Sequence, residues 1–351
     1  MKTARFQTIT QRYPKLRLAV VGDFCLDRYL EIDPERKETS LETGLPVHNV
    51  VAVRSQPGAA GTIVNNLVAL GIGEIHPVGF AGRDGEGVEL VGALRALRGV
   101  KMGSFFCTNH RRTFTYTKPL VIGPDTLPVE LSRLDFKNWT PTPALVEQRL
   151  KAMVRRLARR VDAIILLDQV DQPGTGVVTS GVLATLDDIR RRHARLLILA
   201  DSRRGLRGFP PVTLKMNARE LAALAGSAGE LSREEARSQA SALARSNRQT
   251  VFVTLAEHGL LGATPEGRIE HVPAVPVRGE IDIVGAGDAV TANLTVALAA
   301  GAQLREALEL ANAAASIVIH QLGTTGTASV DQIAGLLLRE SATRRAERAG
   351  T

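Results

Sequence analysis

The sequence has few cysteines, few aromatic residues and no long hydrophobic run, and each shortage excludes a class of protein. Cys25 and Cys107 are too few for a disulfide framework and lack the paired CxxC spacing that is typical of structural zinc sites. The first 15 residues are basic and polar, and no later stretch is apolar for long enough to cross a bilayer. We therefore expect an unexported, cytoplasmic protein with no membrane partner.

The formal net charge of +8 is the feature that most suggests a nucleic-acid partner. Aromatic residues make up only 4% of the chain, which leaves little material for the base-stacking platforms of single-strand binders. The arginine-rich segments alternate with apolar or acidic residues, as solvated helix faces do. The charge therefore predicts no nucleic-acid partner, but a basic surface that favours encounters with anionic substrates.

Two nucleotide-binding signatures are also absent. The sequence has no GxxxxGK[ST], whose lysine grips phosphate, and no GxGxxG, which opens a dinucleotide-binding fold. A P-loop enzyme and a nicotinamide dehydrogenase are both disfavoured.

Short apolar runs of β type alternate with helical patterns along most of the chain. Runs at 16–23, 162–168 and 194–201 each end in Asp, where a strand gives way to a loop. The alternation predicts an α/β fold with a mostly parallel central sheet flanked by helices. We expect one domain over 1–340 and a disordered basic tail at 341–351. Predicted helices lie near 58–70, 84–98, 143–160, 178–193, 217–226, 232–247, 288–300 and 303–321.

Two regions interrupt this alternation. Residues 29–56 and 104–135 are rich in Thr, Val and turn formers and lack a 3.6-residue period. We predict that they leave the main sheet and form a smaller β layer, called the lid below. Such a layer could cover a site or pack against a partner subunit. Its cations Arg111, Arg112, Lys118 and Arg133 are candidate partners for an anionic substrate group.

The stretch DIVGAGD (282–288) places three small residues before a carboxylate. Gly285, Ala286 and Gly287 could expose backbone N–H groups at a helix start, which together form an anion hole. Asp288 could then accept a proton from an attacking hydroxyl as a general base. Alternatively, Asp288 only caps the helix, and taken alone the motif favours the cap.

Three further features have both a structural and a functional interpretation. The stretch from Gly58 could bring a ligand close to the backbone, or only allow close packing of its helix, and the two are about equally plausible. Asn217 and Glu220 could orient waters around magnesium, although a helix cap is the better interpretation in isolation. Asp27 could bind sugar hydroxyls or belong to a solvated loop.

The order of the elements is more informative than any one of them. Six features follow one another along the chain: a strand ending in Gly-Asp, a Gly-rich helix start, GFAGRDGEG (79–87), N-x-x-E, VTLAEHG (253–259) and DIVGAGD (282–288). This order resembles the PfkB, or ribokinase-like, family of carbohydrate kinases over roughly 16–330. VVGDFCLDRYL (20–30) and RTFTYTK (112–118) are most similar to the branch that phosphorylates heptose 7-phosphate. The separate nucleotidyltransferase domain that some of its members carry is expected to have no room here.

The resemblance implies a three-layer ribokinase-like fold and an ATP-dependent, magnesium-assisted kinase. It assigns Asp288 as the catalytic base. The other positions that it carries over are Gly285, Ala286 and Gly287 in the anion hole; Asp27, Gly58, Ala59 and Asp168 toward the sugar; Asn217 and Glu220 near magnesium and the phosphates; and Thr254, Glu257, Gly259 and Asn312 in the ATP site. It also implies that the lid forms a homodimer interface.

Four positions depart from the family pattern. Ala59 replaces a second Gly and Thr62 replaces Asn at the sugar-facing helix start, so the sugar pocket is altered. Ile283 replaces Thr, which leaves a monovalent-cation requirement open, and Ala256 replaces a Gly of the nucleotide stretch. Phosphoryl transfer to a sugar or sugar phosphate is the function that the resemblance implies. A nucleoside kinase of the same fold and a non-catalytic binding protein are the alternatives.

Overall fold

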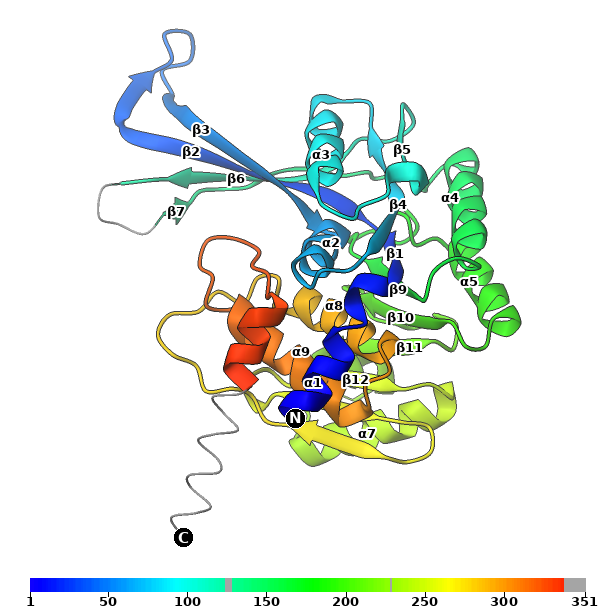
Figure 1. Ribbon diagram of the computed structural model, residues 1–351. Coiled ribbons are helices and arrows are strands. Elements are labelled where there is room, and N and C mark those ends of the chain that lie inside the picture. The colour runs from blue at the N-terminus through cyan, green and yellow to red at the C-terminus, as the bar shows by residue number, and fades with distance from the viewer. Residues whose placement is uncertain (124–127, 228, 338–351) are drawn as a thin grey trace.

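A long, mostly parallel sheet runs through the middle of the computed structural model, which describes residues 1–123, 128–227 and 229–337 (Figure 1). Within these residues its strands are ordered β14-β13-β12-β11-β10-β9-β1-β4-β5, and only the pairs β12–β13 and β13–β14 are antiparallel. The predicted fold class is confirmed. The predicted tail at 341–351 lies outside the described residues. The strands are β1 (Arg17–Gly22), β4 (Glu74–Gly82), β5 (Phe105–Thr108), β9 (Ala163–Asp168), β10 (Leu197–Ser202), β11 (Thr213–Asn217), β12 (Val251–Thr254), β13 (Leu260–Ala263) and β14 (Ile269–Val272).

Helices cover both faces of this sheet, and each face has its own hydrophobic core. One layer consists of α1 (Thr3–Thr10), α2 (Ala60–Ala69), α3 (Gly85–Ala96), α8 (Ala286–Ala299) and α9 (Leu304–Val318). The other consists of α4 (Ala144–Leu157), α5 (Ser180–Arg192), α6 (Ala218–Ala225) and α7 (Arg233–Asn247). Short 3₁₀ turns are η1 (Tyr13–Lys15), η2 (Met102–Ser104) and η3 (Ala256–His258). All eight helices predicted above are present, with ends that differ by a few residues.

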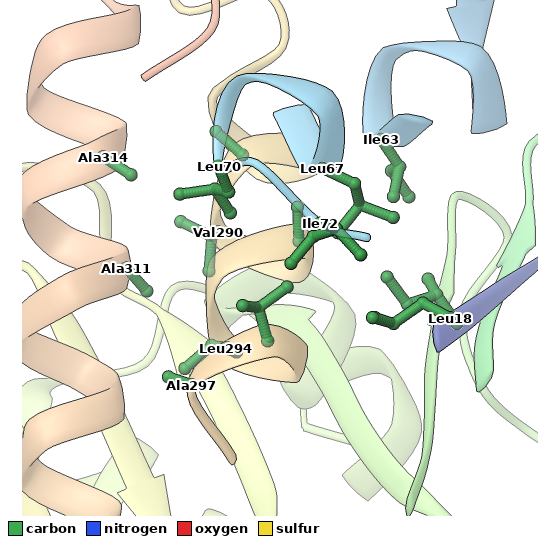
Figure 2. Close-up of a cluster of buried hydrophobic side chains, with 14 of the residues drawn as sticks. Leu18, Ile63, Leu67, Leu70, Ile72, Val290, Leu294, Ala297, Ala311 and Ala314 are labelled. Atoms are coloured by element: carbon green, nitrogen blue, oxygen red, sulfur yellow. The ribbon is translucent and has the colours of Figure 1, made fainter. Parts of the chain in front are cut away.

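The helix that carries Asp288 is held in the middle of the first layer. Figure 2 shows Val290 and Leu294 of α8 between Leu67 of α2 and the small residues of α9. Ala311 and Ala314 lie on the α9 side of this cluster, where small side chains let the two helices approach closely. Because α8 is buried along most of its length, its first turn is fixed relative to the sheet.

The sequence interpretation missed two terminal helices. In α1, Phe6 and Ile9 are buried, and Arg5 pairs with Glu306 at 2.8 Å. Residues 330–337 are also helical, and the described part of the chain ends there. The α1 helix is short and the polar stretch around it gives little periodicity, so only tertiary packing reveals it.

The lid forms a separate sheet, ordered β3-β2-β6-β7, with β8 also paired to β6. Its strands are β2 (Phe24–Thr39), β3 (Pro46–Ala59), β6 (Phe114–Val121), β7 (Val129–Glu130) and β8 (Leu134–Phe136). The lid boundaries predicted from sequence differ at two places. It begins near 24 and not 29, and 105–108 instead form β5 at the edge of the central sheet. Figure 1 shows the β2–β3 hairpin projecting from the layered body.

In the described part of the chain, no helix is long and apolar enough to cross a membrane.

Candidate active site

The Gly-rich turn at the start of α8 has the geometry of an anion-binding helix start. Gly285 has φ +82°, a conformation that an L side chain rarely adopts, and it precedes the first helical residue, Ala286. The N–H of Ala286 is used within the turn, because it donates to the Ile283 carbonyl at 3.2 Å. Within the described residues, the N–H groups of Gly285 and Gly287 have no such recorded partner. Ala286 therefore shapes the predicted anion hole, while the two glycines can supply its donors.

Asp288 does not cap this helix. The cap position is Gly285, no side chain makes a capping hydrogen bond there, and Asp288 lies three residues further on. Burial raises the pKa of Asp288 to about 7, the neighbouring Asp201 adds to the shift, and Lys215 opposes it. A carboxylate with such a pKa is suited to proton transfer near neutral pH. The structure therefore contradicts the cap interpretation of Asp288.

A buried ion pair lies beside the turn. Lys215 Nζ donates to Asp201 Oδ2 at 2.8 Å, and Thr291 Oγ1 donates to the same oxygen, also at 2.8 Å. A Cβ on Gly287 would lie 3.2 Å from Nζ, so the ammonium group faces the anion hole. Burial opposes the ammonium form of Lys215, but Asp201, Asp288 and Glu220 outweigh it and raise the pKa of the lysine. The sequence interpretation did not identify Lys215, whose charge acts on Asp288.

A second carboxylate reaches the site from the lid. Asp27 is buried on β2, and a Cβ on Gly58 would lie 2.5 Å from its Oδ2, so only glycine fits opposite it. Gln56 pairs with Asp27 across the two strands and donates to Thr325 Oγ1 at 2.6 Å. Thr325 in turn packs on Gly285. This chain of contacts ties the lid strands β2 and β3 to the Gly-rich turn at Gly285.

The carboxylate at the end of β9 is incompletely bonded. Asp168 Oδ2 accepts hydrogen bonds from Ser202 Oγ at 2.9 Å and from Arg204 Nη2 at 2.7 Å. Its Oδ1 is buried and has no hydrogen-bond partner among the described residues. Burial raises the pKa of Asp168, and Arg204 opposes that shift. An unpaired buried carboxylate oxygen costs free energy, which a hydroxyl of a bound ligand would recover.

Asn217 and Glu220 form a helix cap. Asn217 Oδ1 accepts from the Glu220 N–H at 2.8 Å, and Glu220 Oε2 accepts from the Asn217 N–H at 2.7 Å. This capping box starts α6. Burial raises the pKa of Glu220, as does the charge of Asp201, while Lys215 lowers it. Glu220 is thus a cap residue that also stands close to the Lys215–Asp201 pair.

Of the other residues assigned to ATP, Thr254, Glu257 and Gly259 lie at the end of β12 and around η3, and Asn312 lies on α9. Thr254 ends β12 and is paired with Asn217 of β11. Gly259 has φ +90°, and a Cβ at this position would collide with the Val272 carbonyl oxygen. Asn312 Nδ2 donates to the Pro273 carbonyl at 2.9 Å. Glu257 is exposed. Asn312 therefore has a structural bond, and a nucleotide role for these residues stays a prediction.

The described residues contain no group of three or more His, Cys, Asp or Glu side chains that could hold a metal ion by themselves. Magnesium in kinase sites usually needs only one or two carboxylates, because waters and substrate phosphates complete its shell. Glu220 supplies one such carboxylate, which is engaged in the capping box through Oε2. A single carboxylate fits magnesium that is otherwise held by water and phosphate.

Two departures from the family pattern fall at strained backbone positions. Ala59 has φ +54° and ψ −117°, and Ala256 has φ +48°. Only one other non-glycine residue in the described part of the chain, Arg248, has a positive φ. Conformations of this kind typically cost on the order of 1–3 kcal/mol for a residue with a Cβ.

Replacing Ala59 with Gly is therefore expected to raise the free energy of unfolding by about 1 kcal/mol. The relief of strain exceeds the roughly 0.5–1 kcal/mol that a glycine costs through chain entropy. Thermal and urea unfolding measure the change. Ala152→Gly, at an exposed position inside α4, is the matched control and should lower stability. Equal destabilisation by both substitutions would contradict the strain at Ala59.

Lys215, Asp201 and Asp23 are the residues of the site that sequence reasoning missed. Asp23 is buried at the end of β1 and accepts the N–H groups of Val177 at 2.6 Å and Gln169 at 2.9 Å, which fixes the segment after Asp168. Burial raises the pKa of Asp23 to about 6, and Asp168 adds to the shift. Asp23 and Asp201 each end an apolar run, and that position was the only feature of the sequence that marked them as candidate site residues.

The three layers, the separate lid sheet and the half-buried Asp288 at a Gly-rich helix start define a ribokinase-like fold. Ribokinase from Arabidopsis thaliana, whose structure was solved with ribose and ATP, matches 92% of this chain and 98% of its own at a TM-score of 0.65 and 18% identity. The family model of the pfkB family carbohydrate kinases matches residues 200–331.

Curated relatives extend the likeness to nearly the whole chain. The bifunctional protein HldE of Pelobacter propionicus is 31% identical over 342 residues, which cover 97% of this chain and 67% of that protein. HldE of Bradyrhizobium sp. is 30% identical over 327 residues, covering 93% of this chain and 64% of that protein. The chain thus spans about two thirds of the length of these relatives. It belongs to the pfkB family of carbohydrate kinases, which are phosphotransferases with a hydroxyl acceptor.

Proposed function

We propose that the chain is an ATP-dependent kinase that transfers the γ-phosphoryl group to a hydroxyl of a sugar or sugar phosphate. The observation that carries this proposal is the placement of Asp288. Its carboxylate has a pKa of about 7 and lies within the first turn of a buried helix, beside a buried ammonium group. Family membership supports the same reaction class.

The site divides the chemistry between a base and fixed positive charge. Asp288 takes the proton of the attacking sugar hydroxyl, so the oxygen becomes nucleophilic as it approaches phosphorus. The N–H groups of Gly285 and Gly287 and the ammonium of Lys215 face the charge that develops on the transferring group. Because Lys215 is already held by Asp201, little reorganisation is needed at the moment of transfer.

The sugar is positioned by groups on the lid and at the end of β9. Asp27 and the free oxygen of Asp168 accept hydrogen bonds from sugar hydroxyls. Gly58 and Ala59 present bare backbone beside Asp27. ATP lies along Asn217, Thr254, Glu257, Gly259 and Asn312. Magnesium would neutralise charge on the phosphates, and Glu220 would hold it through water.

Replacing Glu220 with Gln tests the magnesium assignment. Gln retains the acceptor that the capping box needs, so the melting temperature should hardly change. Removal of the negative charge should raise the magnesium concentration needed for half-maximal activity several-fold. Titration of activity with magnesium at saturating ATP measures this effect. If the magnesium requirement does not change, whether or not the melting temperature falls, Glu220 acts only as a helix cap.

Heptose 7-phosphate is our leading candidate substrate, on the strength of the sequence resemblance and the HldE relatives. ADP formation measured against phosphorylated sugars, free sugars and nucleosides tests the proposal. Turnover with sugars supports it, whereas turnover with nucleosides alone would indicate a nucleoside kinase. Binding of ATP and sugar without any ADP release would indicate a non-catalytic member.

We also propose a cytoplasmic homodimer formed through the lid. The outer part of β3 is largely exposed, and it carries Val50, Val51 and Val53 at exposures of 43–50%. An apolar strand surface of this kind is normally covered by a partner. Sedimentation of the wild type and of a Val51→Lys variant measures the association. A wild-type monomer at micromolar concentration would contradict the dimer.

A further inference from the structure

Trp139 is the only tryptophan of the chain, and it lies on the surface. It is 71% exposed, although an indole ring is among the side chains that gain most from burial. Single exposed apolar side chains are common on proteins, so the exposure by itself indicates no function. Trp139 differs from them because its chain segment is firmly held and its ring lines a pocket.

The backbone is anchored on both sides of this tryptophan. On one side, the buried Asn138 exchanges two hydrogen bonds, each of 3.0 Å, with the backbone of Arg112. On the other side, the buried Arg111 donates to Thr140 Oγ1 at 3.1 Å and to the Pro141 carbonyl. These bonds fix the segment at the two neighbouring residues, while the indole ring itself stays exposed.

Two cations that the sequence suggested as partners of an anionic substrate group are therefore engaged in the structure. Arg111 holds the segment of Trp139, as described above. Arg112 lies 3.5 Å from Asp84 and 3.8 Å from Glu86. Both side chains thus have structural partners.

The indole ring lines a pocket between the lid and the layered body. One wall of this pocket is formed by Phe114 and Tyr116 of the lid strand β6. The opposite wall belongs to the segment that follows β9, and it begins at Val170, two residues after Asp168. The pocket therefore adjoins the segment that leaves the sugar-facing Asp168.

Tyr116 places the same pocket beside the other sugar-facing carboxylate. It is the register partner of Asp27 in the parallel pair β2–β6, and register partners present their side chains on the same face of a sheet. Asp168 is fully buried, and its Oδ1 has no hydrogen-bond partner among the described residues. This unpaired oxygen points to a ligand independently of the tryptophan. A ligand that binds both carboxylates has the pocket of Trp139 next to it.

A sugar has two kinds of surface, its hydroxyl groups and its apolar C–H groups. The carboxylates of Asp27 and Asp168 can bind only the hydroxyl groups. A rigid indole ring offers a large flat surface at a low cost in conformational entropy. Contact between this ring and the C–H groups removes apolar surface of both from water, which favours binding.

We propose that Trp139 is a specificity-determining residue of the acceptor site, and that its indole ring packs against the C–H groups of the acceptor's outer carbons. The inference rests on the proposed kinase function and deepens it, because it concerns the length of acceptor that the same site prefers. Asp27 and Asp168 bind hydroxyls of the inner carbons, and the ring contacts the carbons beyond them. A six- or seven-carbon acceptor therefore gains more from Trp139 than a five-carbon sugar does.

Fluorescence tests the contact directly, because the chain has a single tryptophan. Acrylamide should quench the exposed ring readily in the free protein. Saturation with six- or seven-carbon sugars or their phosphates should lower the quenching constant clearly, whereas a non-hydrolysable ATP analogue alone should not. Absence of protection by every sugar overturns the proposal.

Kinetics of Trp139→Ala test the effect on specificity. The KM for a six- or seven-carbon acceptor should rise on the order of 2- to 10-fold, the usual effect of an aromatic contact, and less for a five-carbon sugar. The kcat and the KM for ATP should stay unchanged, because the contact is equal in the ground state and the transition state. Trp139→Phe keeps a flat ring and should restore much of the affinity.

Leu145→Ala is the matched control for these variants. Leu145 is an apolar side chain, 66% exposed, in the first turn of α4, and its removal should change neither KM. An acceptor KM that is equal in Trp139→Ala and the wild type overturns the proposal. So does a Trp139→Phe variant that binds the acceptor no better than Trp139→Ala.

The fluorescence measurement also separates this inference from two others. Exposed tryptophans occur at contacts between subunits. Protection that grows with protein concentration in the absence of sugar would assign the ring to such a contact and overturn the proposal. ADP formation with an unprotected ring would overturn it and leave the kinase proposal intact. Where no sugar is turned over, protection by a sugar still supports the contact, and its absence overturns it.

Discussion

Replacing Asp288 with Asn is expected to lower turnover by a factor on the order of 10²–10⁴, the usual loss when a positioned general base is removed. Affinity for ATP should change little, because the base acts chiefly in the transition state. Asn keeps the shape of the side chain, and the helix cap is at Gly285, so the fold should be preserved. Steady-state kinetics and ATP binding measure the two effects.

The stability of the Asn variant provides the control. The pKa of Asp288 is about 7 in the folded protein, above its value of 3.8 in an unfolded chain. The folded state therefore holds an extra proton between these values, and stability from this group is lost as the pH rises toward 7. Asn cannot ionise and escapes that loss. Its melting temperature at pH 8 should equal or exceed that of the wild type, and a clear fall would contradict this account of the site.

The second large effect is expected from Lys215→Met. This change leaves Asp201 buried beside Thr291 without its cation, and breaking a buried ion pair from one side typically costs about 3–5 kcal/mol. Chemical unfolding measures the loss. The double variant Asp201→Asn with Lys215→Met removes both charges and should recover much of the stability. A double variant as unstable as Lys215→Met alone would contradict the pairing.

Lys215 should also control the pH dependence of activity. Asp288 must be ionised to accept a proton, so kcat/KM of the wild type should rise with pH and level off above about 7. The ammonium of Lys215 lowers the pKa of Asp288, so its loss should move the rise to higher pH. The profile of Lys215→Met checks the direction, whereas the double variant does not, because it also removes Asp201, whose charge raises the pKa of Asp288. A shift to lower pH would show that Lys215 does not act on Asp288.

The sequence was sufficient for the parts of the fold that follow from local periodicity. The run at 162–168 and the helix at 58–70 have the apolar spacing of buried elements. Whether each forms a strand or a helix was therefore predictable. The short helix α1 was not, because only Phe6 and Ile9 are buried and their effect depends on packing against the body. The β5 strand was assigned to the lid because composition does not reveal to which sheet a strand adds.

The same distinction holds for the site. The GAGD stretch pointed to Asp288 because small residues at a helix start have a local meaning. The Lys215–Asp201 pair joins residues 14 positions apart on two strands, and nothing local marks their contact. The sequence therefore pointed to Asp288, the base that we propose, and missed Lys215, whose charge acts on it. Ala59 and Ala256 were recognised as departures, but their positive φ values, and hence their strain, are visible only in the structure.

Following the γ-phosphoryl group of radiolabelled ATP tests the central claim most directly. Wild-type protein and the Asp288→Asn variant are incubated in parallel with magnesium, labelled ATP and a panel of sugar phosphates. The account predicts that the wild type moves the label into a sugar product, and that the variant, folded and still binding ATP, does so at least 100-fold more slowly. Label found only in inorganic phosphate, or equal transfer by the two proteins, would contradict it.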